Sequence, residues 1–387
     1  MRMSVTSAAL AALALAAAPA AAQESGGFVV RLGRDTIFVE QFTRTADRIE
    51  GTHVTRTPRT TVRTYMATLR PDGTVSRLES TARVPSTPDL LPQTVTITTG
   101  GDSATWRTQR GDTVRETRVA APADAVPWLF NSYAIAEQAL RQARARGGDS
   151  VAVPTVAAVP RQPGAVSFVR HGADSVIMHF VNGVTRARTD AQGRVLGAAA
   201  PDATFKVQVE RVAAVDANAI AASWGGRDQA GQQMGTLSPR DSVFTQVNGA
   251  GVSVAYGRPS MRGRRVVGAL LPYGEVWRTG ANEATHFRTD RDLMIGDTRV
   301  PAGSYTLWTI PGPDQWTVII NKQTGQWGTQ YDPAQDLARI PVSFDRAPGG
   351  PVEQLTLRFE PSACGDGAAL HIVWENTRVV VPFTVVR

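Results

Sequence analysis

The sequence has very little cysteine. Cys364 is the single cysteine among 387 residues, so an intramolecular disulfide is excluded and each domain must be stabilised by core packing. No basic residue flanks Cys364, so we interpret it as a turn residue without chemistry.

Lysine is scarce as well, and the positive charge is therefore carried by arginine. Lys206 and Lys322 are the lysines, within a total of 41 basic residues and a formal net charge of +7. The arginines alternate with acids, as in residues 110–118, and do not gather with aromatic residues as a nucleic-acid site requires. We expect no nucleic-acid partner.

Common catalytic and metal-binding motifs are also missing. The sequence contains no Gly-x-Ser-x-Gly elbow and no His-Glu-x-x-His motif. Its five histidines form no pair at metal-ligand spacing. We therefore expect no metal and no cofactor, and we assign no catalytic residue.

A long apolar run occurs at the N-terminus. Residues 8–18 contain only Ala and Leu, follow the basic Arg2 and are about half as long as the ~20 residues that span a membrane. This pattern predicts a signal peptide over residues 1–22, cleaved between Ala22 and Gln23. We expect an exported protein, periplasmic or secreted, with no transmembrane segment in the mature chain.

What the sequence does contain is β-structure. Within residues 28–212, Thr or Arg alternates with Val, Ile, Trp or Leu over short segments that are separated by turn residues. Pro71-Asp72-Gly73 marks one such hairpin turn. The pattern predicts an antiparallel meander, a half-barrel-like sheet with one buried face.

One amphipathic helix is expected near residues 125–146, capped by Asp124 and ended by Gly147-Gly148. Its apolar stripe includes Leu129, Tyr133 and Leu140. The order of these elements resembles that of the unclosed β-barrels of envelope lipid carriers. The resemblance implies that the stripe forms an apolar ligand face against the sheet.

The chain changes character at residues 213–237, where small and polar residues without periodicity predict a linker. Over residues 238–387, strands with turns every 8–12 residues predict a β-sandwich or jelly roll. The predicted fold is all-β, with two domains.

The C-terminal region also carries a long motif. It begins with Tyr-Gly-Arg-Pro-Ser at residues 256–260, continues as Pro-Tyr-Gly-Glu-Val-Trp-Arg-Thr-Gly-Ala-Asn-Glu-Ala-Thr at residues 272–285, and includes Pro-Ala-Gly-Ser-Tyr-Thr-Leu-Trp-Thr-Ile-Pro at residues 301–311. These segments resemble domain of unknown function 2911, over about residues 238–345 or to the C-terminus. The resemblance implies export and β-structure, and it assigns no role to any residue.

The arginines and aromatic residues of this motif suggest a ligand site, because guanidinium groups grip carboxylate, phosphate or sulfate and tryptophan faces stack on ligands. The candidate ligand-binding residues are Arg258, Arg264, Trp277, Arg278, Asn282, Glu283 and Trp308. A structural alternative is that Trp277 and Trp308 belong to the core and that Arg278 pairs with Glu283 to hold a loop.

Three functional hypotheses follow. The leading one is a non-catalytic envelope binding protein for a lipid, a glycan or an anionic small molecule. The first alternative is an exported hydrolase of envelope glycans, with Glu275, Glu283, His286 and Asp290 as its acid and base groups. The second is a structural module of an envelope assembly. We predict no oligomeric state.

Overall fold

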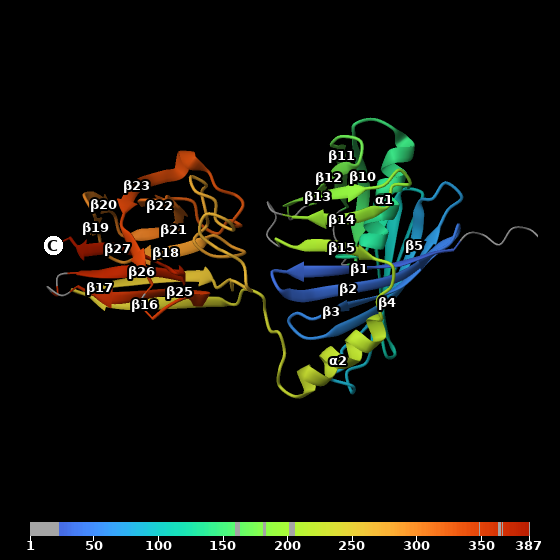
Figure 1. Cartoon of the computed structure of the whole chain (residues 1–387), viewed down its shortest axis with the longest axis horizontal. Helices are drawn as coiled ribbons and strands as arrows, with labels where there is room; N and C mark the ends of the chain where they lie inside the picture. Colours follow the sequence, from blue (N-terminus) through green and yellow to red (C-terminus); the bar gives the residue numbers. More distant parts are fainter. Residues whose placement is uncertain are drawn as a thin grey trace, which may run out of the picture.

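The computed structural model describes residues 23–158, 163–180, 183–200, 206–347, 349–362, 365 and 367–386. The predicted signal peptide and Cys364 lie outside these described residues. The described chain is almost entirely β-structure, as predicted, and forms a large N-terminal sheet and a separate pair of C-terminal sheets (Figure 1).

The N-terminal sheet has 15 strands within the described residues, in the order β8-β7-β6-β5-β4-β3-β2-β1-β15-β14-β13-β12-β11-β10-β9. The strands of its first half are β1 (Glu24–Leu32), β2 (Asp35–Arg44), β3 (Arg48–Thr55), β4 (Thr61–Leu69), β5 (Val75–Arg83), β6 (Gln93–Gly100), β7 (Ser103–Arg110) and β8 (Thr113–Ala120). The strands of its second half are β9 (Val126–Trp128), β10 (Ser150–Ala157), β11 (Gly164–Arg170), β12 (Ser175–Phe180), β13 (Gly183–Thr189), β14 (Val195–Ala199) and β15 (Gln208–Val212).

Neighbouring strands of the N-terminal sheet are antiparallel, except that β9 runs parallel to β10. The sheet curls without closing into a barrel, and its inner apolar side chains form one large core. Trp106 on β7 donates a hydrogen bond to the Ala157 carbonyl at the end of β10, 2.8 Å away. This bond ties two distant parts of the curled sheet together.

Helix α1 (Tyr133–Arg146) packs inside the curl (Figure 1). Its end at Gly147 was predicted. Its predicted beginning was wrong, because Ser132 caps the helix by accepting the Ile135 amide hydrogen at 3.2 Å, whereas Asp124 pairs with Arg146. The residues before Ser132 include β9, whose pairing with β10 removes them from the helix.

A second helix, α2 (Ala217–Gln229), lies within the segment predicted to be an irregular linker. The Asp216 side chain caps it, and Ala217, Ala221 and Trp224 pack on an apolar patch of the outer sheet face. That patch consists of Val39, Val54 and Val62. Burial against these valines stabilises a helix whose own amphipathic signal is weak.

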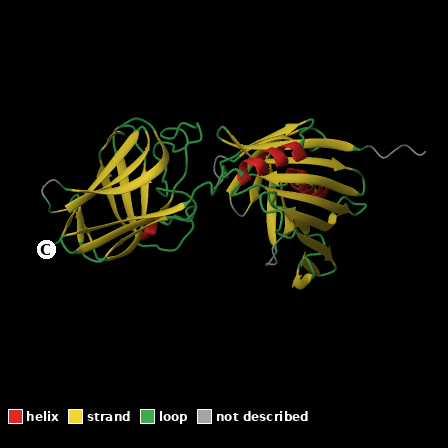
Figure 2. Cartoon of the chain, turned by 90° about the horizontal axis from the view of Figure 1, so that it is seen from below, coloured by secondary structure: helices red, strands yellow, loops and turns green. Residues whose placement is uncertain are grey.

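The C-terminal sheets pack face to face as the predicted β-sandwich (Figure 2). One sheet has the order β16-β17-β18-β21-β22-β23, with β16 (Arg240–Val247), β17 (Ala250–Gly257), β18 (Thr285–Thr289), β21 (Gly303–Ile310), β22 (Trp316–Asn321) and β23 (Asp336–Val342). The other contains β20 (Thr298–Val300), β19 (Leu293–Ile295), β27 (Thr377–Val385), β26 (Gly367–Glu375) and β25 (Val352–Pro361), with β24 (Phe344–Arg346) paired to β27. A short 3₁₀ helix, Pro333–Gln335, precedes β23.

The N-terminal sheet touches the C-terminal sandwich at the turn between β1 and β2. The Arg34 amide donates to the Arg262 carbonyl at 2.9 Å, and the Arg262 guanidinium binds the Asp35 carboxylate at 2.6 Å. In the described part of the chain, neither helix is long and apolar enough to cross a membrane.

Candidate functional site

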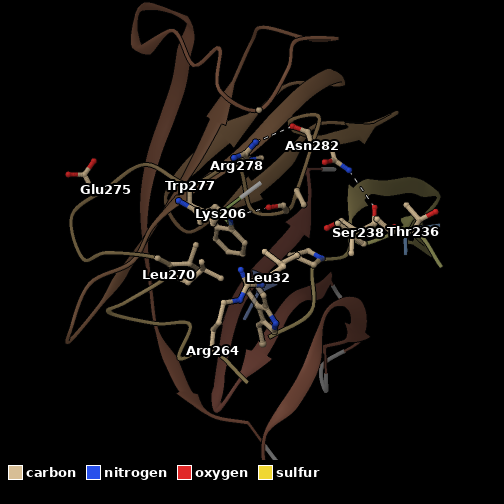
Figure 3. A pocket seen from close by; sticks show the side chains of 18 of the residues that line it. Leu32, Lys206, Thr236, Ser238, Arg264, Leu270, Glu275, Trp277, Arg278 and Asn282 are labelled. Atoms are coloured by element: carbon tan, nitrogen blue, oxygen red, sulfur yellow. Dashed lines mark hydrogen bonds between the residues drawn. The ribbon is translucent and has the colours of Figure 1, made fainter. Parts of the chain in front are cut away.

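A cavity of about 810 Å³ lies beside this contact, where the N-terminal sheet meets the C-terminal sandwich (Figure 3). Its size falls in the range of small-molecule sites. One wall comes from the ends of β1 to β3, a second from residues 236–238, and a third from the motif-bearing loops of the sandwich. The loop residues include Arg264, Trp277, Arg278 and Asn282, which are four of the predicted site residues.

Arg278 lies half-buried on the sandwich wall. Its guanidinium donates to the Asn282 carbonyl at 3.2 Å, and no carboxylate pairs with it among the described residues. Burial lowers its pKa because the charged form loses solvation. Asn282 sits in a left-handed conformation at φ 65°, which turns its carbonyl towards Arg278. The remaining guanidinium hydrogens of Arg278 are available to a ligand.

Arg264 is the second half-buried guanidinium of the cavity. It donates to the backbone carbonyls of Met261 and Ser260, both at 2.9 Å, and forms no ion pair with the described residues. Burial and the neighbouring Arg262 charge lower its pKa, and the more distant Glu353 and Asp35 carboxylates partly oppose that shift. Arg264 and Arg278 therefore place two positive charges on one cavity without a carboxylate that binds either of them.

Trp277 lies between Arg278 and Arg264 in the view of Figure 3. Its backbone pairs with Thr309 of β21 through bonds of 2.7 and 2.8 Å, and its indole nitrogen donates to the Gly280 carbonyl. The ring stacks on Trp374 with centroids 5.8 Å apart. Trp374 is buried in the sandwich core and holds the half-buried Trp277 ring in place on this wall.

The opposite wall is mainly apolar. Leu32 and Phe38 come from the N-terminal sheet, and Leu270 faces them from the sandwich. The described lining also includes one lysine, Lys206, and one acidic residue, Glu275. Glu275 is exposed, and in Figure 3 its side chain points away from the other labelled residues. The cavity thus combines apolar surface with excess positive charge.

Three predicted site residues lie elsewhere. Arg258 binds the Leu355 carbonyl, the Thr356 hydroxyl and the Asp241 carboxylate, so it fastens β25 to the other sheet. Glu283 pairs with Arg240 and not with Arg278, which corrects the proposed loop pairing. Trp308 is 1% exposed and packs in a separate small core with Ala284 and Ile319. It is therefore a core residue, as the structural alternative predicted, and does not line the cavity.

The predicted apolar ligand face is filled by protein. Leu129 and Leu140 are each 2% exposed in the large core, and Tyr133 packs against the same core with its ring 5.6 Å from that of Phe28. Leu140 also touches a cavity of about 400 Å³ at the C-terminal end of α1. The candidate site is therefore the cavity between the N-terminal sheet and the sandwich, and not the face of helix α1.

The four acid and base groups considered for hydrolysis do not converge. Glu275 lies at the cavity, whereas Glu283 is exposed and paired with Arg240 outside its lining. His286 accepts a hydrogen bond from the Gly325 amide, and Asp290 accepts one from the Gly251 amide. The two glutamates share no cleft of the kind that a glycosidase mechanism needs.

Sequence reasoning missed the lining residues outside the motif. Leu32 and Phe38 have the pattern of ordinary strand residues, and Lys206 lies within a strand-like run, residues 204–212, that carries no motif. The one available signal was the rarity of lysine. Their place at the site depends on how the N-terminal sheet meets the sandwich.

Residues 238–383 match the model of the family described as "Protein of unknown function (DUF2911)". The match confirms the resemblance predicted from the motif at residues 256–285. It covers the sandwich and leaves the N-terminal sheet unassigned.

No curated protein matches the chain. Among solved structures, the chain is similar to a crystal structure of a DUF1089 family protein from Pseudomonas aeruginosa, with 14% identity and a TM-score of 0.31. That similarity covers 42% of this chain and 89% of the other. A likeness at this level carries no argument about function.

Proposed function

We propose that the protein is an exported, non-catalytic binding protein that holds an anionic ligand with an apolar body in the cavity between the N-terminal sheet and the sandwich. The observation that carries this proposal is the pair Arg264 and Arg278. Both guanidinium groups are half-buried on the cavity wall, and neither has a carboxylate partner in the described chain.

A partly buried charge without a counter-ion is costly, and a bound anion removes that cost through charge-assisted hydrogen bonds. The apolar body of the ligand would cover Trp277, Leu270 and Phe38, which line the same space. Phosphate, sulfate and carboxylate head groups all satisfy this requirement. A neutral glycan satisfies the apolar and hydrogen-bonding surfaces but leaves the two charges unpaired.

Titration calorimetry of the full chain with octyl sulfate and octyl glucoside tests the proposal, because the two probes share a chain and differ in head-group charge. We expect octyl sulfate to bind more tightly, and Arg278→Gln to weaken that binding roughly tenfold, the loss of one charge-assisted hydrogen bond. Arg265→Gln is the matched control, since Arg265 is exposed and absent from the lining. Equal weakening of octyl sulfate binding by both variants, or octyl glucoside binding as tightly as octyl sulfate, contradicts the proposal.

Export is a separate part of the proposal and rests on the pattern of residues 1–22. Fractionation of cells that produce the full chain, followed by N-terminal sequencing, tests it. We expect a product in the envelope or medium that begins at Gln23. A cytoplasmic product that begins at Met1 contradicts export and leaves the binding proposal untouched.

A further inference from the structure

We infer that the ligand of this cavity carries two negative charges, matching Arg264 and Arg278, together with an apolar segment that covers Trp277. The inference rests on the proposed function and specifies the ligand class.

The argument begins with charge balance at the cavity. Arg264 donates hydrogen bonds to the Met261 and Ser260 carbonyls, and Arg278 donates one to the Asn282 carbonyl. Backbone carbonyls satisfy donors but do not neutralise a cation. The Glu353 and Asp35 carboxylates act on Arg264 at longer range, but neither binds its guanidinium, and no carboxylate of the described residues binds Arg278. Two guanidinium groups without a bound carboxylate therefore remain for the ligand to pair with.

The second step concerns where these charges sit. In Figure 3 the two arginines lie on either side of Trp277, whose ring is held by Trp374 and by the Gly280 carbonyl. All three residues line the same cavity, so a ligand whose apolar segment covers Trp277 can present its anionic groups to the two guanidinium groups. A phosphate monoester concentrates both charges in one head, whereas a dicarboxylate separates them. Both have the charge that the cavity lacks.

A set of eight-carbon probes separates charge from chain length. Octyl phosphate and octanedioate carry two charges at pH 8, and octyl sulfate and octanoate carry one. We expect at least one of the two dianions to bind the full chain roughly tenfold more tightly than its monoanionic counterpart, because each added charge-assisted contact is worth about that factor. The dianion that binds more tightly shows whether the charges lie together or apart.

The pH dependence gives a second readout. A phosphate monoester loses its second charge below a pKa of roughly 6, while a sulfate ester keeps its single charge. No histidine is among the described residues that line the cavity, so we expect the ligand to be the titrating partner. If octyl phosphate is the preferred dianion, we expect its advantage over octyl sulfate to disappear at pH 5.

Variants connect the preference to the two arginines. Arg264→Gln and Arg278→Gln should each reduce the advantage of the preferred dianion roughly tenfold, while Arg265→Gln preserves it. Circular dichroism and thermal unfolding show that each variant is folded. Monoanions that bind as tightly as dianions overturn the inference while leaving the proposed function intact. Failure of all four probes overturns both.

Discussion

Asp35 accepts a 2.6 Å hydrogen bond from the Arg262 guanidinium and thereby joins the first hairpin of the N-terminal sheet to the sandwich. The pair is largely buried, with side-chain exposures of 28% and 12%. Arg262 is held in turn by its own amide, which donates to the Glu353 carboxylate at 2.8 Å. The contact is therefore anchored on the sandwich side by β25.

Replacing Asp35 with Asn should loosen this contact. The substitution removes a charge-assisted bond worth about 1–2 kcal/mol in a partly exposed setting. We expect hydrogen exchange of the Arg34 amide, which donates to the Arg262 carbonyl, to become roughly tenfold faster. Glu210→Gln is the control, because the Glu210–Arg31 pair is exposed and lies within the N-terminal sheet. An unchanged exchange rate at Arg34 would show that the ion pair does not hold the contact.

Gly33 provides a steric test of the same contact. It has a φ of +61°, and an added Cβ atom would lie 2.2 Å from the Arg262 carbonyl oxygen. We therefore expect Gly33→Ala to be destabilised by about 1 kcal/mol through its left-handed backbone and also to separate the hairpin from the sandwich. Gly101→Ala pays only the backbone cost, since Gly101 has a φ of +58° with no atom within 4 Å of the new Cβ.

We expect small-angle scattering to show a more extended average shape for Gly33→Ala alone. Indistinguishable scattering profiles for the two alanine variants would contradict the steric prediction.

Glu137 should be essential for the stability of the N-terminal sheet. Its carboxylate is fully buried and binds Arg44 at 2.5 Å, Arg211 at 2.7 Å and the Val195 amide at 2.8 Å. Glu137→Gln removes one of the two carboxylates that neutralise Arg44 and Arg211 and leaves only Glu24, so we expect a loss of about 3 kcal/mol in unfolding free energy. Urea unfolding measures it, with Glu116→Gln on the exposed strand β8 as the control. A loss below about 1 kcal/mol would contradict this role.

His53 should make the protein sensitive to acid. Burial and the facing Arg63 charge lower the pKa of His53 to about 3. The unfolded chain, with a pKa near 6.5, therefore binds a proton that the folded chain does not, and stability falls as pH falls below 6.5. Between pH 6.5 and pH 5 we expect a loss of about 2 kcal/mol of unfolding free energy.

His53→Gln should lack this part of the pH dependence, and urea unfolding across the range measures it. The exposed His179→Gln variant should keep the dependence. Glu40 lies opposite His53 on β2, and burial raises its pKa. That shift acts in the reverse direction, since it favours the folded state at low pH. Comparing His53→Gln with the parent chain isolates the histidine. Parallel pH profiles for the two would contradict the prediction.

The sequence predicted turns and helix ends correctly where residues adjacent in the chain determine them. The turn at Asp72-Gly73 forms because Gly73 adopts a φ of 82° and the Asp72 side chain accepts the Thr74 amide hydrogen. Gly147 ends α1 for a similar local reason. The beginning of α1 was not predictable in this way, because both Asp124 and Ser132 can cap a helix and pairing of β9 with β10 decides between them.

Helix α2 was not predicted, because its sequence has only a weak helical pattern. Ala217, Ala221 and Trp224 recur at helical spacing, which was a usable signal, but Gly225 and Gly226 lower the helix propensity. The outer valine patch of β2 to β4 overrides that propensity.

The candidate site was also predictable only in part. Its motif half, with Trp277 and Arg278, is contiguous in sequence, whereas the half that Phe38 contributes exists only after the domains meet.

The pairing of β1 with β15 has a consequence for how the polypeptide is made. Val29 lies opposite Glu210, so the first strand of the sheet lies beside its last. During synthesis, one edge of β1 stays without its partner until about 180 further residues have emerged (212 − 32 = 180). Folding of the N-terminal sheet is therefore limited by the long-range pairing of β1 with β15. Until that pairing forms, the exposed edge of β1 can associate with other chains. A holding chaperone that covers β1 would have its greatest effect before residue 208 appears.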